Sequence, residues 1–293
     1  MIPLVPLLVD TVVAYEDPGT LSIVHEWGVV VFEDNATLLC GGPWPELVYP
    51  DDMCAEAPVV WIHGEPFTGT FQVELPDDQY FTFLYPEPSG NSEGVAQWQI
   101  STIPELSAEE SLPPSGPGAY YGPFDWALPF WRSVPSLLLL FEDGTTENFL
   151  YYECTVNPEF TDHFFSRGGH GNPVFQTGVV SEALLFTPRG TFVLELGEEE
   201  ILALDLPITG ETSPDFVREI FCSWADSRLK SQEITALWET WMPELTEGDD
   251  YWLVFPIPAR YHNEISRIEL RTNLGGTVAY ERLFLGAVRL NRP

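Results

Sequence analysis

Hydrophobic and polar positions alternate along much of the chain with the two-residue period of a β-strand. In residues 69–76, Phe71, Val73 and Leu75 fall on one face and the residues between them on the other. Similar segments are short, rich in β-branched and aromatic residues, and bounded by turn-forming residues. They cover residues 21–33, 57–64, 79–86, 95–102, 135–143, 148–156, 181–188, 190–197, 250–258, 264–272 and 284–290. The pattern predicts a mainly β protein, an antiparallel β-sandwich.

Two adjacent segments have the period of a helix instead. Residues 212–229 begin with Ser213 as an N-cap and Pro214 at the first helical position. Residues 231–245 carry an apolar face, and Pro243 is expected to end that helix. In a β protein, such a helical hairpin is expected to cover an open end of the sandwich or a sheet edge.

The chain therefore divides into successive parts. Residues 1–20 are either a first strand or the remnant of a signal peptide, because their apolar run lacks a basic start and contains an aspartate. Residues 21–211 form the sandwich, with a long loop over residues 103–134 that is rich in Pro, Gly, Ser and Glu. The helical hairpin spans residues 212–248, and residues 249–293 return as strands to the sheet.

The net charge restricts the partners. The chain has 45 acidic and 12 basic residues and a formal charge of −33, and it contains no basic stripe. Phosphate backbones repel such a surface, so we expect no nucleic-acid binding. No run of about 18 apolar residues is present, so no membrane span is expected. Three explanations of the charge stay open: a solvated surface in a salty medium, cation binding that includes Ca²⁺, and the composition of an extracellular protein.

The four cysteines do not have the spacing of a zinc site. Cys40 and Cys54 flank a Pro-rich loop, and a disulfide between them would close about 15 residues and stabilise the fold by on the order of 3 kcal/mol. Cys154 and Cys222 would then be left to pair with each other. The alternative is that all four are buried thiols.

Two strands carry the candidate chemistry. His25 shares a face with the tryptophan two positions later, and His63 shares a face with Trp61 and Glu65. If these strands pair, His25 and His63 come together, with Glu65 or Glu153 as a carboxylate. Two imidazoles and a carboxylate suit a transition metal such as zinc, copper or iron.

Two other interpretations of these histidines stay open. A histidine beside tryptophan on a half-buried strand is more commonly a hydrogen-bonded core residue than a metal ligand. Histidine and glutamate are also suitable for general acid–base catalysis. The sequence contains neither the H-E-x-x-H pattern of zinc proteases nor the G-x-S-x-G pattern of serine hydrolases.

Aromatic residues gather in and after the long loop. Exposed aromatic rings stack on sugars or anchor protein partners, whereas buried rings would fill the core under the loop. The residues are Trp98, Tyr120, Tyr121, Trp126, Phe130 and Trp131. Carbohydrate binding is therefore one expectation, and core packing is the other.

Several short motifs resemble a bacterial family of exported proteins. V-H-E-W-G at 24–28 is similar to the signature V-H-E-W-G-T-F that this family carries near the start of its mature chains, with Val29-Val30 in place of Thr-Phe. Similarity continues in A-P-V-V-W-I-H-G (57–64), F-T-F-L-Y-P-E (81–87), E-N-F-L-Y-Y-E (147–153) and the helical segment 231–245 with the strand that follows it. The resemblance implies an exported, mostly β domain.

Taken together, these observations predict an acidic, non-enzymatic protein at the cell envelope or outside the cell. It would bind a protein partner or assemble with itself, by strand addition at a sheet edge. The alternative is a metal-dependent site at His25 and His63 with hydrolytic or redox activity. A further alternative is carbohydrate binding.

Overall fold

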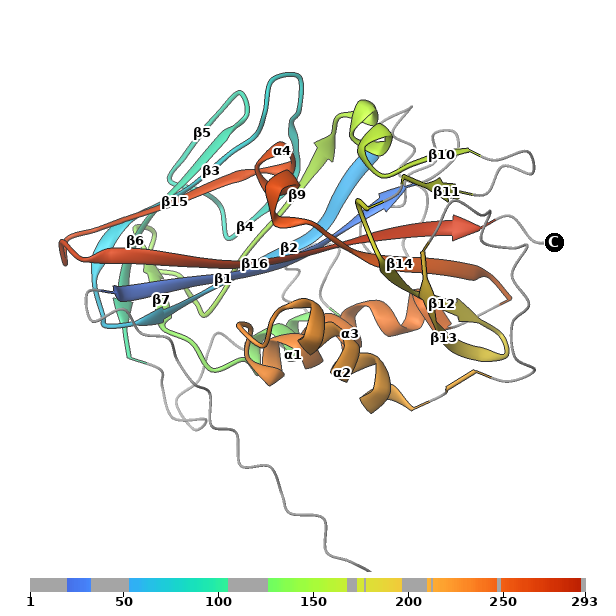
Figure 1. Cartoon of the computed structure of the whole chain (residues 1–293). Coiled ribbons are helices and arrows are strands. Elements are labelled where there is room, and N and C mark those ends of the chain that lie inside the picture. The colour runs from blue at the N-terminus through green and yellow to red at the C-terminus, as the bar shows by residue number, and fades with distance from the viewer. Residues whose placement is uncertain are drawn as a thin grey trace, which may run out of the picture.

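The structure of the protein, a computed structural model, describes residues 20–32, 53–104, 126–167, 173–176, 178–196, 210–211, 213–246 and 249–290. Two sheets and a layer of helices are stacked on one another, with the larger sheet in the middle (Figure 1). The prediction of a mainly β fold with predominantly antiparallel sheets is confirmed. Among the described residues, no helix is long and apolar enough to cross a membrane.

The central sheet has eight strands in the order β13-β12-β14-β16-β1-β2-β9-β4. The sequence bounds of these strands, in that order, are Gly190–Glu195, Glu182–Thr187, Tyr251–Ile257, Thr277–Leu290, Thr20–Phe32, Met53–Gly64, Leu150–Val156 and Phe81–Tyr85. Strands β1 and β16 pair in parallel, which makes this sheet mixed, whereas the other pairs are antiparallel. The first and last described strands therefore lie side by side at the centre of the fold.

The second sheet has the order β15-β3-β6-β7-β8, with β5 paired to β6. Its strands are β15 (Arg267–Thr272), β3 (Thr68–Glu74), β6 (Val95–Ile103), β7 (Leu138–Phe141), β8 (Thr146–Glu147) and β5 (Gly90–Ser92). A separate pair joins β10 (Phe165–Arg167) to β11 (Pro173–Phe175). A 3₁₀ turn at Pro158–His163 and another at Ala259–Tyr261 complete this side, and the latter leads into α4 (His262–Ile265).

The helices cover the other face of the central sheet. They are α1 (Leu128–Arg132), α2 (Pro214–Trp224) and α3 (Ser231–Thr246). Two corrections to the sequence prediction follow. The helical hairpin packs on a sheet face rather than at an edge, and α3 continues through Pro243 to Thr246. Part of the expected loop 103–134 is the helix α1, while residues 105–125, like residues 1–19, lie outside the described part of the chain.

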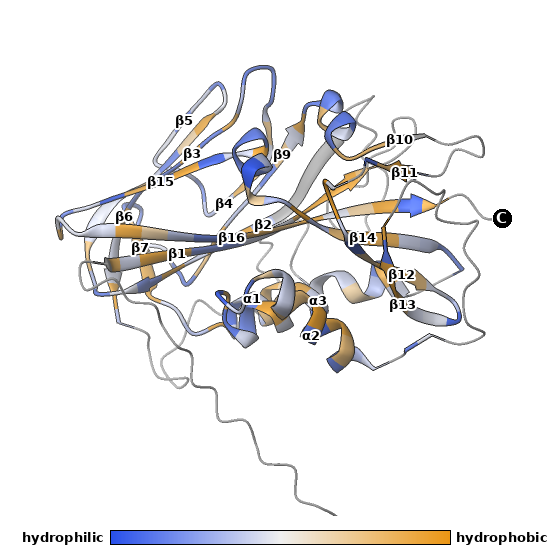
Figure 2. Cartoon of the chain, in the orientation of Figure 1, coloured by the Kyte–Doolittle hydropathy of each residue, from blue (hydrophilic) through white to orange (hydrophobic). Residues whose placement is uncertain are grey.

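Both faces of the central sheet are buried, and this explains the apolar run in β1. Val24, Val30 and Phe32 belong to the core between the two sheets. Trp27, together with Val29 and Val31, belongs to the core under the helices. Strand pleating sends neighbouring side chains to opposite faces, so the same short segment serves two cores. Figure 2 shows hydrophobic residues along the strands of the central sheet and on the helices that cover it.

The tryptophans of the helix-side core fix the helices to the sheet. Trp61 Nε1 donates to the carbonyl of Trp131 at 3.2 Å, and Trp131 Nε1 donates to Thr240 Oγ1 at 2.9 Å. Trp98 and Trp131 are 0% and 1% exposed, which confirms core packing for these two aromatic residues. Tyr120 and Tyr121 fall outside the described residues.

Candidate functional site

The two histidine-bearing strands are direct neighbours. In the antiparallel β1–β2 pair, Ile23 is opposite His63 and His25 is opposite Trp61. His25 and His63 therefore occupy diagonal positions on one face, and their ring centroids are 4.5 Å apart. His25 and His63 are 6% and 8% exposed, so both residues are buried at the edge of the helix layer.

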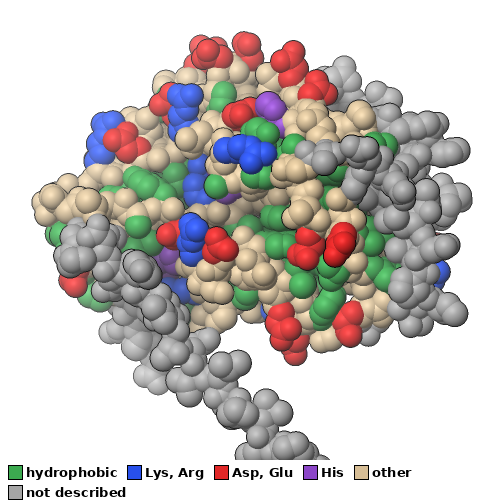
Figure 3. Space-filling view, in the orientation of Figure 1, with side chains coloured by type: hydrophobic (Ala, Val, Ile, Leu, Met, Phe, Trp, Pro, Cys, Tyr) green, Lys and Arg blue, Asp and Glu red, His purple; other side chains and the backbone are tan. Residues whose placement is uncertain are grey.

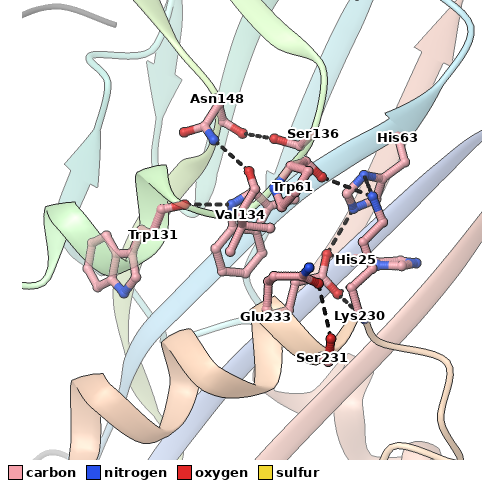
Figure 4. A network of polar contacts seen from close by, with 12 residues as sticks. His25, Trp61, His63, Trp131, Val134, Ser136, Asn148, Lys230, Ser231 and Glu233 are labelled. Carbon is pink, nitrogen blue, oxygen red and sulfur yellow. Dashed lines mark hydrogen bonds and ion pairs between the residues drawn. The ribbon is translucent and has the colours of Figure 1, made fainter. Parts of the chain in front are cut away.

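The carboxylate between the rings comes from helix α3 (Figure 4). Glu233 is 0% exposed, and both of its oxygens accept from His25 Nδ1 at 2.9 and 3.0 Å. His63 Nε2 lies 2.9 Å from Glu233 Oε1. Ligand atoms of these three residues all lie within 4.8 Å of one another, and theirs is the one such group among the described residues.

Glu233 is held by the start of its own helix. Residue 230 precedes the first helical residue, and its backbone N–H donates to Glu233 Oε2 at 2.6 Å. The backbone N–H of Glu233 in turn donates to the carbonyl of residue 230 at 3.0 Å. This is the glutamate half of a capping box, in which the third helical residue reaches back to the N-cap. The carboxylate is thereby fixed in the direction of the two imidazoles.

Lys230, the only lysine of the chain, closes the cluster. Its Nζ donates to the Pro135 carbonyl at 2.9 Å and lies 3.0 Å from His63 Nδ1. An ammonium has no lone pair to offer, so His63 Nδ1 accepts and the ring proton is on Nε2, which donates to Glu233. The four side chains form a continuous chain of hydrogen bonds from Lys230 through His63 and Glu233 to His25.

The protonation states follow from the surroundings. Burial raises the pKa of Glu233, but hydrogen bonds from His25 and His63 oppose it and the pKa falls to about 2. Burial lowers the pKa of His63, and the hydrogen bond to Glu233 offsets this only in part. At neutral pH the cluster therefore contains an ionised carboxylate beside a neutral His63, which are the forms that bind metals.

Neither carboxylate expected from the sequence lies in the cluster. Gly64 has a φ of 114°, which turns the chain after His63 and leaves Glu65 exposed instead of beside the imidazoles. Glu153 accepts a hydrogen bond from Tyr151. The next residue on β9, Cys154, pairs with Ala55 on β2. Ala55 is eight residues before His63, which is about 26 Å along the strand. Burial raises the pKa of Glu153. Glu233 takes the place that the sequence analysis assigned to Glu65 or Glu153.

The signal for Glu233 was present in the sequence. It occupies the third position of a helix and lies on the same side as Leu237 and Thr240, which are both buried. A glutamate on the apolar side of a helix needs a buried partner. Which partner it has depends on how the helix docks, and the sequence contains no sign of that.

The disulfide prediction lies largely outside the described part. Cys40 is outside the described residues, as is the side chain of Cys54. Cys154 belongs to the core between the sheets, whereas Cys222 packs on the helix-side core. These two thiols are therefore on opposite faces of the central sheet, and the suggested pairing between them is wrong.

Glu26, between His25 and Trp27, belongs to a second buried network on the opposite face of β1. Glu26 is 0% exposed, forms an ion pair with Arg282 and accepts from the hydroxyl of Tyr152 at 2.6 Å. Ser266 Oγ is 2.6 Å from the Tyr152 hydroxyl and accepts from Arg282 Nη2 at 2.8 Å. The motif V-H-E-W-G thus divides its side chains between the two faces: histidine and tryptophan toward the helices, glutamate toward the second sheet.

Comparisons with known proteins returned no match to a family model, to a curated protein or to a solved structure. The resemblance to exported proteins with a V-H-E-W-G-T-F signature stays a prediction.

Proposed function

We propose that this protein binds a divalent transition-metal ion, zinc by the type of its ligands, through His25, His63 and Glu233. The observation that carries the proposal is the convergence of two imidazoles and one carboxylate from β1, β2 and α3 within 4.8 Å. Nitrogen donors favour a transition metal over Ca²⁺, which takes oxygen ligands.

The spacing suits such an ion after a small movement. Zinc bonds of about 2.0–2.2 Å in a tetrahedral arrangement place ligand atoms about 3.4 Å apart. The corresponding hydrogen-bonded separations to Glu233 are 2.9 Å from each imidazole. Moving the ligand atoms apart by about half an ångström makes room for the ion, which a change of side-chain torsion can supply.

Metal binding replaces protons at this site. The protons on His25 Nδ1 and His63 Nε2 now lie between the imidazoles and Glu233, where the ion would lie. For His63, the proton moves to Nδ1, and Lys230 keeps its hydrogen bond to the Pro135 carbonyl. Metal binding at His63 is therefore coupled to a change of tautomer, which frees Nε2 for the ion. The net charge of −33 favours approach of a dication by long-range attraction.

Three protein ligands leave a coordination position for water or a substrate. Zinc lowers the pKa of a water molecule bound at that position and polarises a carbonyl group bound there, which is the chemistry of metal-assisted hydrolysis. Hydrolysis is therefore the reaction class that this ligand set supports.

Elemental analysis of the purified full chain tests the proposal. After equilibration with zinc and dialysis, we expect about one zinc per chain. The double variant His25→Ala/His63→Ala and the single variant Glu233→Gln are expected to lose it. His163→Ala is the matched control, because His163 is a partly exposed histidine that pairs with Glu264 away from the cluster.

Near-ultraviolet circular dichroism checks that each variant is folded. Zinc below 0.1 per chain in the folded wild-type protein, or equal zinc in wild type and the folded double variant, overturns the proposal.

Partner binding, self-assembly and carbohydrate binding at the cell envelope stay predictions. The exposed large hydrophobic residues in the described part of the chain are Tyr80, Val193 and Tyr280. Tyr80 precedes β4, whereas Val193 is on β13 and Tyr280 is on β16, and single exposed hydrophobic residues are common on protein surfaces. No specific observation therefore raises these functions above metal binding.

A further inference from the structure

A cavity of about 280 Å³ lies beside β16, beyond the end of β14. The connector between α2 and α3 forms one wall, and residues 256–262 with residues 281–283 form others. Figure 3 shows this face, where a basic side chain flanked by acidic ones lies next to a hollow. The volume is close to the lower end of the range for small-molecule sites.

The cavity is one strand away from the histidine cluster. Glu281 lines the cavity, and its partner in the parallel β1–β16 ladder is His25. Arg228, which donates to Glu281 at 3.2 Å, also lines the cavity and precedes Lys230 by two residues. Neighbouring strands are about 4.8 Å apart, so cavity and cluster share a wall.

Two residues that line the cavity, His262 and Arg282, have unused hydrogen-bonding capacity. His262 Nε2 is 2.9 Å from the Ile257 carbonyl, so Nε2 carries the proton and Nδ1 has a lone pair without a hydrogen-bond partner among the described residues. Arg282 uses its N–H groups on Glu26, Asn263 and Ser266, and one of the five N–H groups has no partner in the described part of the chain. A ligand that both donates and accepts hydrogen bonds is complementary to this pair.

The rim carries exchangeable charges of both signs. Arg228 is 58% exposed and pairs with Asp226 at 3.0 Å and with Glu281 at 3.2 Å. Exposed ion pairs contribute little to stability, so a ligand with its own charges can replace them. The remaining walls are apolar and include Leu229 and Leu283.

The connector that forms the rim has a strained backbone. Asp226 and Ser227 have φ values of 51° and 56°, and neither is a glycine. A left-handed backbone conformation is strained for such residues, and strain of this kind is concentrated at ligand-binding segments. The strain turns the chain so that Arg228 faces Glu281 across the mouth of the cavity.

We infer that this cavity binds a small zwitterion with an apolar side chain, that is, a free α-amino acid. The carboxylate contacts Arg228 and Arg282, the ammonium contacts Glu281 and His262 Nδ1, and the side chain fills the apolar part. This inference needs no metal and goes beyond the proposed function.

Isothermal titration of the full chain with a matched set of probes tests the inference. L-leucine has all three features, 4-methylpentanoate lacks the ammonium, isoamylamine lacks the carboxylate, and glycine lacks the apolar group. We expect L-leucine to bind at least tenfold more tightly than each of the other three. Absence of L-leucine binding at millimolar concentration overturns the inference, and so does equal affinity for 4-methylpentanoate or isoamylamine.

Two variants of residues that line the cavity test whether L-leucine binds there. Ala259 is exposed and lines the cavity, so Ala259→Phe fills it without disturbing the core. We expect Ala259→Phe and Arg228→Gln each to weaken L-leucine binding at least tenfold, while Arg271→Gln, which removes an exposed arginine on β15, leaves it unchanged. Unchanged affinity in both cavity variants overturns the assignment to this cavity. The titration is repeated with a chelator present, and we expect L-leucine to bind with the same affinity. A failure of the metal proposal would therefore not affect the result of this test.

Discussion

Glu233 accepts a hydrogen bond from His25, which lies 208 positions earlier in the chain. The same carboxylate accepts from His63 on the neighbouring strand, so one residue of a helix joins two central strands of the sheet. This contact fixes the docking of α3 and creates the only group of potential metal ligands among the described residues.

Replacing Glu233 with glutamine tests its structural role. The amide keeps one acceptor oxygen but loses the charge, and hydrogen bonds to a charged group contribute about 1.5–3 kcal/mol. We expect the free energy of unfolding of metal-free protein at pH 7 to fall by about 2–3 kcal/mol, measured by urea denaturation. The wild-type carboxylate has a pKa of about 2, below its ordinary 4.5, so its contribution is present above pH 4.5 and is lost as the pH falls toward 2.

Glu239→Gln is the control on the same helix, because Glu239 is on the outer side and lies 3.8 Å from Arg218. Its effect is expected within about 0.5 kcal/mol. A Glu233→Gln protein as stable as wild type, with the same acid profile, would show that the carboxylate contributes nothing to docking.

His262 makes a separate prediction about pH. Burial first, and then the charge of Arg282, lower its pKa from 6.5 to about 4. The unfolded chain therefore binds a proton between pH 6.5 and pH 4 that the folded chain does not, and stability falls as the pH falls through this window. The loss is on the order of 3 kcal/mol at pH 4. In His262→Gln, the amide still donates to the Ile257 carbonyl, and we expect a flatter stability profile in that window, measured by urea denaturation at a series of pH values.

Lys230 is expected to oppose metal binding. Its ammonium is 3.0 Å from His63 Nδ1. This contact keeps the His63 proton on Nε2, the nitrogen that faces the metal position. The positive charge of the ammonium also repels the metal ion. Lys230→Met removes both effects, and even a screened charge at this range changes the affinity for a dication by about tenfold or more. Competition with a zinc-sensitive dye measures the change. Arg271→Met, an exposed and distant cation, is the control, and a loss of affinity in Lys230→Met would show instead that Lys230 positions His63 for binding.

Gly286 tests the register of the central sheet. It is opposite Phe255, and a Cβ atom at position 286 would lie 2.3 Å from the Phe255 ring. That ring is 0% exposed and packs on Phe32 and Phe175, so it has little freedom to move. We expect Gly286→Ala to reduce stability by about 1–3 kcal/mol.

Gly90→Ala is the matched control for Gly286→Ala, since its Cβ would have no atom closer than 4.0 Å. We expect Phe255→Leu to lower the free energy of unfolding less in the Gly286→Ala protein than in the wild-type protein. Simple additivity of the two substitutions would show that the residues do not contact each other.

The sequence by itself determined most of the strands and the two long helical segments, but not how they are layered. Alternation in residues 69–76 corresponds to β3, and the continuous apolar run around Val29 corresponds to a strand buried on both faces. The face that each histidine shares with a tryptophan was also predictable, whereas the pairing of the two histidine strands was only a condition of the metal-site hypothesis. These features are local: the period of the side chains follows from backbone geometry, which each segment carries with it.

Only the tertiary structure decided which carboxylate meets the histidines. Glu65 is two residues from His63 in the chain, yet Gly64 turns it away, while Glu233 arrives from a helix 170 positions later. The parallel pairing of β1 with β16 likewise joins the two ends of the described chain. A single sequence records the preferences of each segment but not the docking of one on another, because docking energy comes from the fit of whole surfaces rather than from the period within either of them.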